Sequence, residues 1–495
     1  MAPGIGLPEA VRRVLPALGP EPVWLVGGSV RDALLGRPTT DFDFAVRGDG
    51  VALGRRLANV LGADYFDLDP TRRTGRVLLT LEAGRRATFD FASLRGADIL
   101  QDLAGRDFTL NAMALPLVPS GEVGALIDPL GGAADLRRRE LRACSPSAIA
   151  DDPIRAVRSV RLAVDLECRI EDETLRQVRQ ARPLLEQVSP ERVRDELFRL
   201  LDMPKASAAI RLLAELDLSG ALVPELEALR GLEQPPPHAF DGLEHSLATA
   251  SHLADLIALL TGRAGTAEAR HLAEAEALTA LAAHRSRGIE YVDFAPSFGR
   301  PRRALLLWAS LLHDAGKPAT RVVTEGGVRF LGHETVGSRL AVEASRRLRL
   351  STVEQAEVEL TVLHHMRPEW LESEPDLTRR AVYRFFRAVE SVGPSVVLLS
   401  LADLLARYVP PIPIDVWRRR LGVARRLLRA WFEEREEVVS PTPLLTGEDV
   451  MRSLGLPSGP EVGRILDLLR EAQAAGDVTS RQEAEAFVRS AAGAR

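Results

Sequence analysis

The sequence is 495 residues long, which exceeds one hydrophobic core, because domains of soluble proteins usually hold about 100–200 residues. With 46% hydrophobic and 27% charged residues the chain is not disordered, and its net charge of −5 means that any nucleic acid must bind a local basic surface. Two cysteines exclude a disulfide scaffold, and apolar runs such as Ala304–Leu312 are too short to span a membrane, so we expect a cytoplasmic protein.

The first part of the chain is predicted to be mixed α/β. A helix is expected to begin at Val30, directly after a glycine turn, and to end at Gly36. From Asp152 onward apolar residues recur at helical spacing, so the rest of the chain is predicted to be all-α. Short apolar or alternating segments predict four strands: Val23–Val26, Phe42–Val46, Val77–Leu81 and Ala87–Phe91.

Histidines and prolines indicate the domain boundaries. All nine histidines lie between His238 and His365, about a quarter of the chain. Proline-rich segments at Gln234–Pro237 and Pro410–Pro413 interrupt the helical pattern on either side of this interval. We therefore predict four domains, at residues 1–145, 146–235, 236–410 and 411–495.

The glycine turn is a candidate phosphate-binding loop. Gly27, Gly28 and Ser29 lead from a predicted strand into a predicted helix, and Arg31 follows in the first turn. Glycine lets the backbone approach a phosphate closely, and the N–H groups at a helix start are free to bind it.

Two carboxylates follow this turn on a predicted strand. Asp41 and Asp43 alternate with phenylalanines, so both carboxylates point to the same face of the strand. Adjacent carboxylates repel each other, and Mg²⁺ relieves that repulsion, so the pair is a candidate metal site. Asp90 is either a third carboxylate beside them or a strand-end residue without a role. A second pair, Asp67 and Asp69, precedes Pro70 and follows no glycine turn, so we interpret it as a loop.

Asp152 and Arg155 form a candidate nucleotide-reading pair. They lie three residues apart at the start of a predicted helix, so their side chains are neighbours. Together they offer an acceptor beside a donor, which matches the base-pairing edges of cytosine and adenine and rejects those of uracil and guanine. Arg158, one turn further on, would add a base or phosphate contact. The alternative is an ordinary surface salt bridge.

Histidine and aspartate side chains of the third domain form a candidate centre for a divalent transition metal. Imidazole and carboxylate groups from separate helices are typical ligands of such ions. The residues are His245, His313, Asp314 and Asp403, with His333 and His364 as further candidates.

An arginine-rich segment could bind an RNA backbone. Between Arg379 and Ala430 there are eleven arginines and three acidic residues, with several aromatic side chains among them. Such a segment can neutralise phosphates. It can equally form solvated helix faces.

Taken in order, these motifs resemble one family. The segments Leu25–Asp32 with Asp41–Asp43, then Arg106–Ala112, Asp151–Arg158 and Ser189–Glu196 resemble the motifs of class II polymerase-β-like nucleotidyltransferases, a group that contains tRNA CCA-adding enzymes and bacterial poly(A) polymerases. The histidine-containing domain resembles the HD phosphohydrolase domain that some CCA-adding enzymes carry. One departure is Asp151, where the family usually has glutamate.

The resemblance implies an α+β protein with a mixed α/β nucleotidyltransferase head followed by an all-α neck, HD domain and tail. It implies Mg²⁺ at Asp41 and Asp43, and nucleotide contacts from Arg106 and Asp107, with Asn111 or Asp107 holding the ribose or bracing the loop. In the HD domain it implies Ni, Mn, Co, Fe or Zn.

The function predicted from these features is addition of all or part of the 3′-terminal CCA to tRNA from CTP and ATP, alongside HD phosphohydrolase activity. Two alternatives stay open. One is a poly(A) polymerase, which shares the head motifs. The other is an HD phosphohydrolase whose head only binds nucleotide, which would leave Asp41 and Asp43 without a role.

Overall fold

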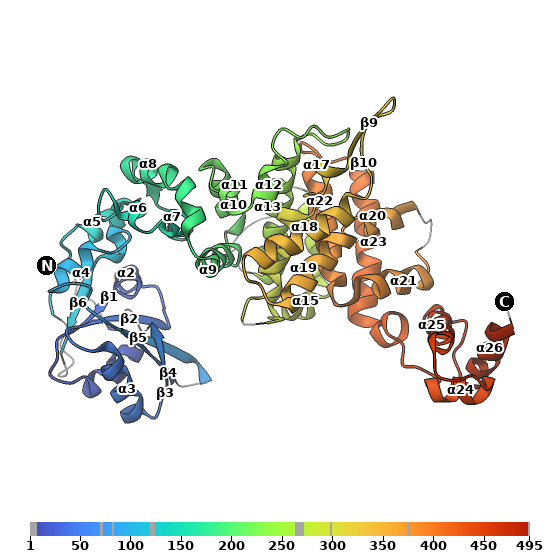
Figure 1. Ribbon diagram of the computed structural model, residues 1–495, viewed down its shortest axis with the longest axis horizontal. Coiled ribbons are helices and arrows are strands. Elements are labelled where there is room, and N and C mark those ends of the chain that lie inside the picture. The colour runs from blue at the N-terminus through green and yellow to red at the C-terminus, as the bar shows by residue number, and fades with distance from the viewer. Residues whose placement is uncertain are drawn as a thin grey trace. The chain divides into compact units, whose positions relative to one another are not determined.

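The computed structural model describes residues 7–493, except 70–72, 82–83, 119–123, 263–271, 298 and 374–376. The chain divides into two compact units, Met1–Val188 and Ser189–Arg495. Unit 1 contains a mixed sheet, whereas unit 2 is almost entirely helical (Figure 1). This arrangement confirms the predicted α+β class, while the finer division into four domains stays a prediction.

Unit 1 is built on a six-stranded sheet with the strand order β3-β4-β5-β2-β1-β6. β2 and β5 pair in parallel, and every other neighbouring pair in this sheet is antiparallel. The strands are β1 (Val23–Val26), β2 (Asp41–Val46), β3 (Asp64–Asp69), β4 (Thr74–Thr80), β5 (Arg86–Ser93) and β6 (Ala114–Leu117). All four predicted strands are present: β1 has the predicted bounds, and the ends of the other three differ by at most three residues.

The paired strands β2 and β5 place core side chains on one face of the sheet and the candidate site residues on the other. Phe42 lies opposite Phe89 and Phe44 opposite Phe91, and all four rings are at most 1% exposed. Their centroids lie 4.6–6.2 Å apart in stacked arrangements, which favours this register. Because side chains alternate along a strand, the aspartates between these rings point to the opposite face of the sheet.

Helices and short strands complete unit 1. α3 packs against β3, β4 and β5 and joins the phenylalanine core. The helices are α1 (Glu9–Val14), α2 (Gly28–Leu35), α3 (Gly50–Leu61), α4 (Ile99–Ala104), α5 (Gly132–Arg138), α6 (Ala148–Asp151), α7 (Ile154–Leu166) and α8 (Asp172–Gln180). The 3-10 helices are η1 (Leu15–Ala17), η3 (Thr109–Asn111) and η4 (Arg182–Gln187), and the short strands are β7 (Glu140–Leu141) and β8 (Arg169–Ile170).

Unit 2 begins with α9 (Pro190–Leu201), α10 (Ala206–Glu215), α11 (Ser219–Leu222) and α12 (Pro224–Glu227). The histidine-containing region follows with α13 (Gly242–Thr261), α14 (Leu272–Ala282), α15 (Arg285–Asp293), α16 (Arg302–Leu312), α17 (Lys317–Thr320), α18 (His333–Arg347), α19 (Thr352–His364), α20 (Arg367–Trp370), α21 (Arg379–Val389) and α22 (Gly393–Ala406). Within it, α13 packs against α16 and α22, and it also contacts the preceding α10.

The last helices of unit 2 are α23 (Ile414–Glu433), α24 (Gly447–Leu454), α25 (Pro460–Ala475) and α26 (Arg481–Gly493). The final three enclose a small hydrophobic core of their own. Short helical turns connect longer elements at η5 (Leu371–Ser373), η6 (Glu390–Val392) and η7 (Arg435–Val439).

Two predictions about secondary structure are wrong. The segment with Asp67 and Asp69 is strand β3 rather than a loop, because its backbone pairs with β4. The histidine-containing region is not purely helical, because β9 (Arg321–Thr324) and β10 (Gly327–Phe330) form a hairpin that projects from it (Figure 1). The signal for this hairpin is the Gly326-Gly327 turn between the β-branched segment Val322–Thr324 and the alternating Val328 and Phe330.

One helical run is longer and more apolar than the runs considered in the sequence. Among the described residues, Arg379–Ala406 is long and apolar enough to cross a membrane by length and composition alone. However, 83% of its apolar window is buried inside the protein, as in the core helix of a folded domain.

Candidate functional site

Gly27 shapes the entrance to α2. Its φ of +71° favours glycine, and α2 begins directly after it at Gly28, two residues earlier than predicted. A Cβ on Gly27 would lie 3.0 Å from Arg106 Nη1 and 3.4 Å from Asp43 Oδ2. Any side chain here would therefore fill the space between the candidate arginine and the candidate carboxylate.

Asp41 and Asp43 lie on the exposed face of β2, as predicted. Although the side chain of Asp43 reaches solvent, the surrounding protein atoms and then the neighbouring Asp90 raise its pKa, and Asp41 adds to this effect. Three carboxylates on one face of the sheet create a negative potential that a divalent cation would neutralise. This donor set fits the hard, oxygen-binding ions of which Mg²⁺ is one.

Asp90 lies directly opposite Asp43 in the β2–β5 register. Both of its oxygens accept hydrogen bonds from Arg76 on β4, at 2.7 and 2.6 Å. This bidentate pair supplies positive charge beside Asp43 and fixes the orientation of the Asp90 carboxylate.

Ser29 positions the carboxylate strand. Its side chain is buried, and its hydroxyl accepts a hydrogen bond from the Asp43 N–H at 3.1 Å and donates one to the Asp41 carbonyl at 3.2 Å. The hydroxyl of Ser29, a member of the candidate phosphate-binding turn, is therefore bonded to the backbone of β2. It joins the glycine turn to the strand that presents both carboxylates.

Replacing Ser29 with alanine is expected to cost about 1–3 kcal/mol of unfolding free energy and to slow nucleotide addition, because it leaves the part-buried Asp43 N–H without its acceptor. Denaturant unfolding and transfer rates measure the two effects. Thr39→Ala is the matched control, since the Thr39 hydroxyl also contacts the Asp41 backbone but lies nearer the surface. Equal losses in both variants would contradict a special role for Ser29.

A polar network connects the motifs of unit 1. Arg31 forms a bidentate pair with Asp32 and donates to Asn111 Oδ1 at 2.7 Å. Asn111 donates to Asp107 Oδ1 at 3.2 Å, and Arg158 reaches Asp107 Oδ2 at the same distance. Burial opposes ionisation of Asp107, but Arg158 and the local N–H donors lower its pKa. Asp107 and Asn111 thus brace the loop and link it to α7.

Arg155 lies beside Asp152, as predicted, with its Nε 3.7 Å from Asp152 Oδ2. Its guanidinium also donates to the carbonyls of Arg106, Ala148 and Gly105 at 3.0–3.2 Å. The neighbouring Arg106 is bonded to Asp102, at 2.9 and 3.1 Å. The reading pair is therefore anchored to the backbone that carries Arg106.

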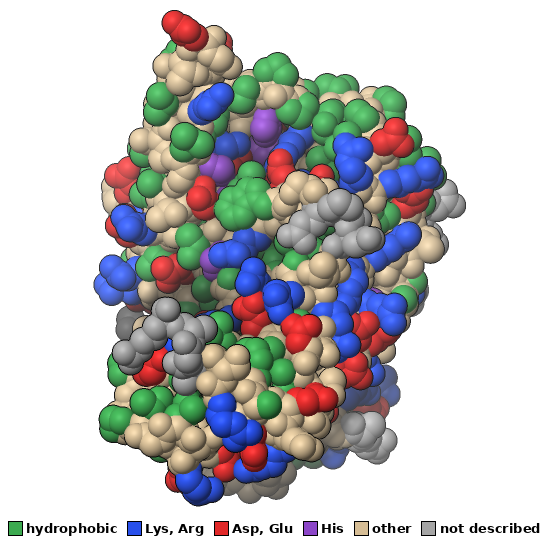
Figure 2. Space-filling model, turned by 90° about the vertical axis from the view of Figure 1, so that its right-hand side faces the viewer, with side chains coloured by type: hydrophobic (Ala, Val, Ile, Leu, Met, Phe, Trp, Pro, Cys, Tyr) green, Lys and Arg blue, Asp and Glu red, His purple; other side chains and the backbone are tan. Residues whose placement is uncertain are grey.

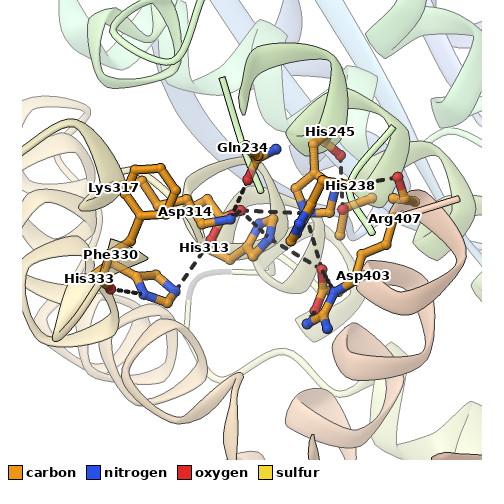
Figure 3. A network of polar contacts seen from close by, with 12 residues as sticks. Gln234, His238, His245, His313, Asp314, Lys317, Phe330, His333, Asp403 and Arg407 are labelled. Carbon is orange, nitrogen blue, oxygen red and sulfur yellow. Dashed lines mark hydrogen bonds and ion pairs between the residues drawn. The ribbon is translucent and has the colours of Figure 1, made fainter. Parts of the chain in front are cut away.

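In unit 2 the predicted metal ligands converge from separate helices (Figure 3). His245 on α13 lies 3.1 Å from Asp403 on α22, measured from Nε2 to Oδ1. Asp314 Oδ2 lies 3.2 Å from His313 Nε2 and 3.4 Å from His245 Nε2, and Asp314 Oδ1 lies 3.5 Å from His333 Nε2. All five side chains are buried.

The imidazoles are oriented for ligation through Nε2. Nδ1 of His313, His333 and His365 lies 2.7–2.8 Å from a carbonyl three residues earlier, and that of His245 lies 3.4 Å from the Ala406 carbonyl. This contact assigns a proton to Nδ1 and turns Nε2 toward the other donors. Burial lowers the pKa of His313, but Asp314 and Asp403 outweigh burial and raise it. Burial lowers the pKa of His245, and burial together with His313 and His333 lowers the pKa of His365 to about 3. Both rings are therefore neutral near pH 7.

The donors form two groups that each fit a cation, with ligand atoms within 4.8 Å of one another: His245, His313 and Asp403, and Asp314, His333 and His365. Among the described residues, His313 Nε2 is buried and forms no aligned hydrogen bond, although Asp314 Oδ2 lies 3.2 Å away. His333 Nε2 and His365 Nε2 are 3.3 Å apart, where two lone pairs repel unless a proton or a metal ion intervenes.

His364 is not part of these groups, and His365 takes the place predicted for it. His364 Nδ1 instead accepts a hydrogen bond from Arg367 at 2.9 Å. The helical phase of α19 explains the difference, because Val358, Val362 and His365 share its buried face. That spacing was the signal in the sequence.

Comparison with family models matches residues 23–142 to the Poly A polymerase head domain. Residues 168–229 match the probable RNA and SrmB-binding site of polymerase A, and residues 242–408 match the HD domain. An A-adding tRNA nucleotidyltransferase of Deinococcus radiodurans is 36% identical over 94% of this chain and 94% of its own length. A CC-adding tRNA nucleotidyltransferase of Geobacter sulfurreducens is 34% identical over 94% of this chain and 91% of its own length.

The chain belongs to the tRNA nucleotidyltransferase family. Solved structures of CCA-adding enzymes have the same fold as this nucleotidyltransferase. A CCA-adding enzyme in its apo form has a TM-score of 0.62 at 21% identity and covers 97% of this chain and 93% of its own. The Thermotoga maritima CCA-adding enzyme in complex with tRNA has a TM-score of 0.58 at 22% identity and covers 98% of this chain and 95% of its own.

The arginine-rich segment of this nucleotidyltransferase is largely ion-paired. Arg380 and Arg384 contact Glu471, Arg387 contacts Asp467, and Arg418 contacts Glu276. Figure 2 shows Lys and Arg side chains lying beside Asp and Glu over the face in view. The positive charge counted in the sequence is therefore partly neutralised by acidic residues that are distant along the chain.

Proposed function

We propose that this chain adds all or part of the 3′-terminal CCA to tRNA, using CTP and ATP. The observation that carries the proposal is the pair Asp41 and Asp43 on the exposed face of β2, beside the Gly27 turn and Arg106. The curated relatives support tRNA as the acceptor, since they include both CC-adding and A-adding enzymes of similar identity.

In the proposed reaction the RNA 3′-oxygen bonds to the α-phosphorus of the nucleotide, and the bond from that phosphorus to the pyrophosphate oxygen breaks. Asp41 and Asp43 would hold divalent ions, which we propose to be Mg²⁺. Such ions lower the pKa of the attacking hydroxyl and neutralise the triphosphate. The backbone of Gly27 and Gly28 would approach the phosphates, and Arg106 would contact them.

The remaining motif residues would hold and read the nucleotide. Ser29 would fix the spacing between the glycine turn and the carboxylates. Arg31, Asp107 and Arg158 would act through their common network to position the loop that contacts the ribose. Asp152 and Arg155 would read the base, with Arg155 held in place by backbone carbonyls.

Substituting Asp152 with alanine is expected to relax base choice, because it removes the acceptor for the exocyclic amino group of C and A. A mispaired buried donor or acceptor costs about 1–3 kcal/mol, so roughly ten- to hundredfold discrimination against UTP should be lost. The ratio of CTP to UTP incorporation measures this loss. Asp151→Ala on the preceding helix is the control. An unchanged ratio in Asp152→Ala would show that protein side chains do not read this edge.

For unit 2 we propose a metal-dependent phosphohydrolase site of the HD type. His245, His313, Asp314 and Asp403 would hold a divalent transition metal (Ni, Mn, Co, Fe or Zn), and His333 and His365 would complete the donor set. Such an ion activates water and polarises a phosphoryl oxygen.

Both cysteines are free thiols, which supports a reducing, cytoplasmic location.

Extension of defined tRNA ends tests the proposed addition. Transcripts that end at the discriminator base, at C and at CC are incubated with each labelled nucleotide. Ordered incorporation of C, of A or of both supports the proposal and identifies the added nucleotides. Unlimited A addition on unrelated RNA would instead identify a poly(A) polymerase, and no addition to any RNA end would refute the proposal.

A further inference from the structure

A row of alternating charges leads from the candidate metal ligand Asp403 to α23, with Asp403, Arg407 and Arg420 buried and Glu369 partly exposed. Arg407, which caps the C-terminal end of α22, donates from Nη2 to Asp403 Oδ2 at 2.7 Å and more weakly from Nε to Oδ1 at 3.4 Å. The same Nη2 donates to Glu369 Oε2 on α20 at 2.5 Å. Arg407 therefore joins a candidate metal ligand to a carboxylate outside the candidate metal site (Figure 3 shows Arg407 beside Asp403).

Arg420 on α23 closes this row. Its side chain is 2% exposed, and its Nη2 lies 3.2 Å from Glu369 Oε2. Its Nε is bonded to Glu372, and its Nη1 donates to the Ser400 carbonyl at 3.0 Å. Because Ser400 lies one turn before Asp403 on α22, Arg420 binds both the helix that carries the ligand and the carboxylate that holds Arg407.

We infer that Glu369 and Arg420 are positioning residues for the metal ligand Asp403, acting through Arg407. This inference rests on the metal site proposed for unit 2. The contacts of Glu369 and Arg420 described above include none of the histidines, so the inference assigns neither residue a direct catalytic role.

Orientation is the first effect of this row. Arg407 makes its shorter bond to Oδ2, which leaves Oδ1 directed toward His245 Nε2 at 3.1 Å. A carboxylate held by a charge-assisted bond on one oxygen presents the other in a fixed direction. Partners of this kind commonly change metal affinity by 10–100-fold when they are removed.

Charge is the second effect. Arg407 alone would neutralise Asp403 and weaken its attraction for a divalent cation. Glu369 on the other side of Arg407 offsets that charge, and Arg420 in turn holds Glu369 in place. A guanidinium as buried as that of Arg420 is costly unless it is paired, and here three acceptors from three elements satisfy it.

Binding of Co²⁺ to the full-length protein tests the inference. The protein is stripped with chelator and titrated in millimolar Mg²⁺, which favours the oxygen-rich head site and competes poorly for imidazole. Visible absorption reports both affinity and ligand geometry. Glu369→Gln removes the charge but keeps the shape, and Arg420→Lys keeps the charge but loses the fork. Arg418→Lys is the matched control, since Arg418 lies on the same helix, is exposed, and pairs with Glu276.

Glu369→Gln and Arg420→Lys are expected to weaken Co²⁺ binding by about ten- to hundredfold and to alter the Co²⁺ spectrum, while Arg418→Lys changes neither. Wild-type affinity and spectrum in both test variants would overturn the positioning role, even if their melting temperatures fall. Should Arg420→Lys fail to fold, Glu369→Gln decides alone. A His313→Ala variant that binds Co²⁺ with wild-type affinity would overturn the proposed metal site, and this inference with it.

Discussion

Asp43→Asn is expected to abolish nucleotide addition, lowering the rate by roughly a thousandfold or more, because a neutral amide cannot hold a divalent cation. Metal ions contribute several kcal/mol to such reactions, and each 1.36 kcal/mol is a factor of ten. The fold should be unaffected or more stable. The pKa of Asp43 is raised in the folded protein, so its ionised form opposes folding above the ordinary carboxylate pKa, and asparagine removes that opposition. Extension of labelled tRNA and denaturant unfolding measure the two effects.

Asp67→Asn is the matched control for this experiment. Asp67 also lies on a strand of the same sheet, but it accepts a hydrogen bond from Tyr65 at 2.5 Å and has no glycine turn beside it. We expect nucleotide addition at close to the wild-type rate. Substantial transfer by Asp43→Asn, with Mg²⁺ present and contaminating enzyme excluded, would show that other carboxylates bind the metal.

The double variant His313→Ala, Asp314→Asn is expected to lose transition-metal-dependent hydrolysis of 2′,3′-cyclic phosphates or phosphomonoesters and to keep tRNA extension. It removes one imidazole and one charged ligand from the donor set, whereas Asp41 and Asp43 belong to the other compact unit. Asparagine at position 314 keeps an oxygen for the buried Lys317, whose Nζ lies 2.6 Å from Asp314 Oδ2. Both activities are assayed on the same preparation.

His364→Ala is the control for the double variant, since His364 pairs with Arg367 outside the donor groups and should retain hydrolysis. Loss of both hydrolysis and tRNA extension in a double variant that melts at the wild-type temperature would argue against two independent sites. Hydrolysis by the double variant at the wild-type rate would exclude His313 and Asp314 from the reaction.

Features with a strong local pattern could be predicted from the sequence. The alternation of Asp41 and Asp43 with phenylalanines determines which face of β2 carries the carboxylates, and the structure has that face exposed. The three-residue separation of Asp152 and Arg155 likewise brings their side chains to 3.7 Å. Periodicity and spacing contain this information because they depend only on backbone geometry.

Contacts between distant segments could not be predicted in the same way. Nothing near Ser29 indicates that its hydroxyl bonds to the β2 backbone, and nothing near Arg420 indicates a carboxylate on α20. Such partners are determined by tertiary packing. The choice between His364 and His365 depended on the phase of one helix, which a pair of adjacent histidines alone does not define.

The register of β2 has a consequence for how this protein tolerates change. Sliding the strand by one residue along β5 would turn Asp41 and Asp43 into the apolar layer and expose Phe42 and Phe44 to water. The misaligned sheet would bury charged carboxylates and lose the packing of the phenylalanine rings. The four side chains from Asp41 to Phe44 therefore disfavour the wrong register as well as present the carboxylates. The requirements of the candidate active centre and those of folding thus fall on one short strand, and a substitution that disturbs its alternating pattern affects both.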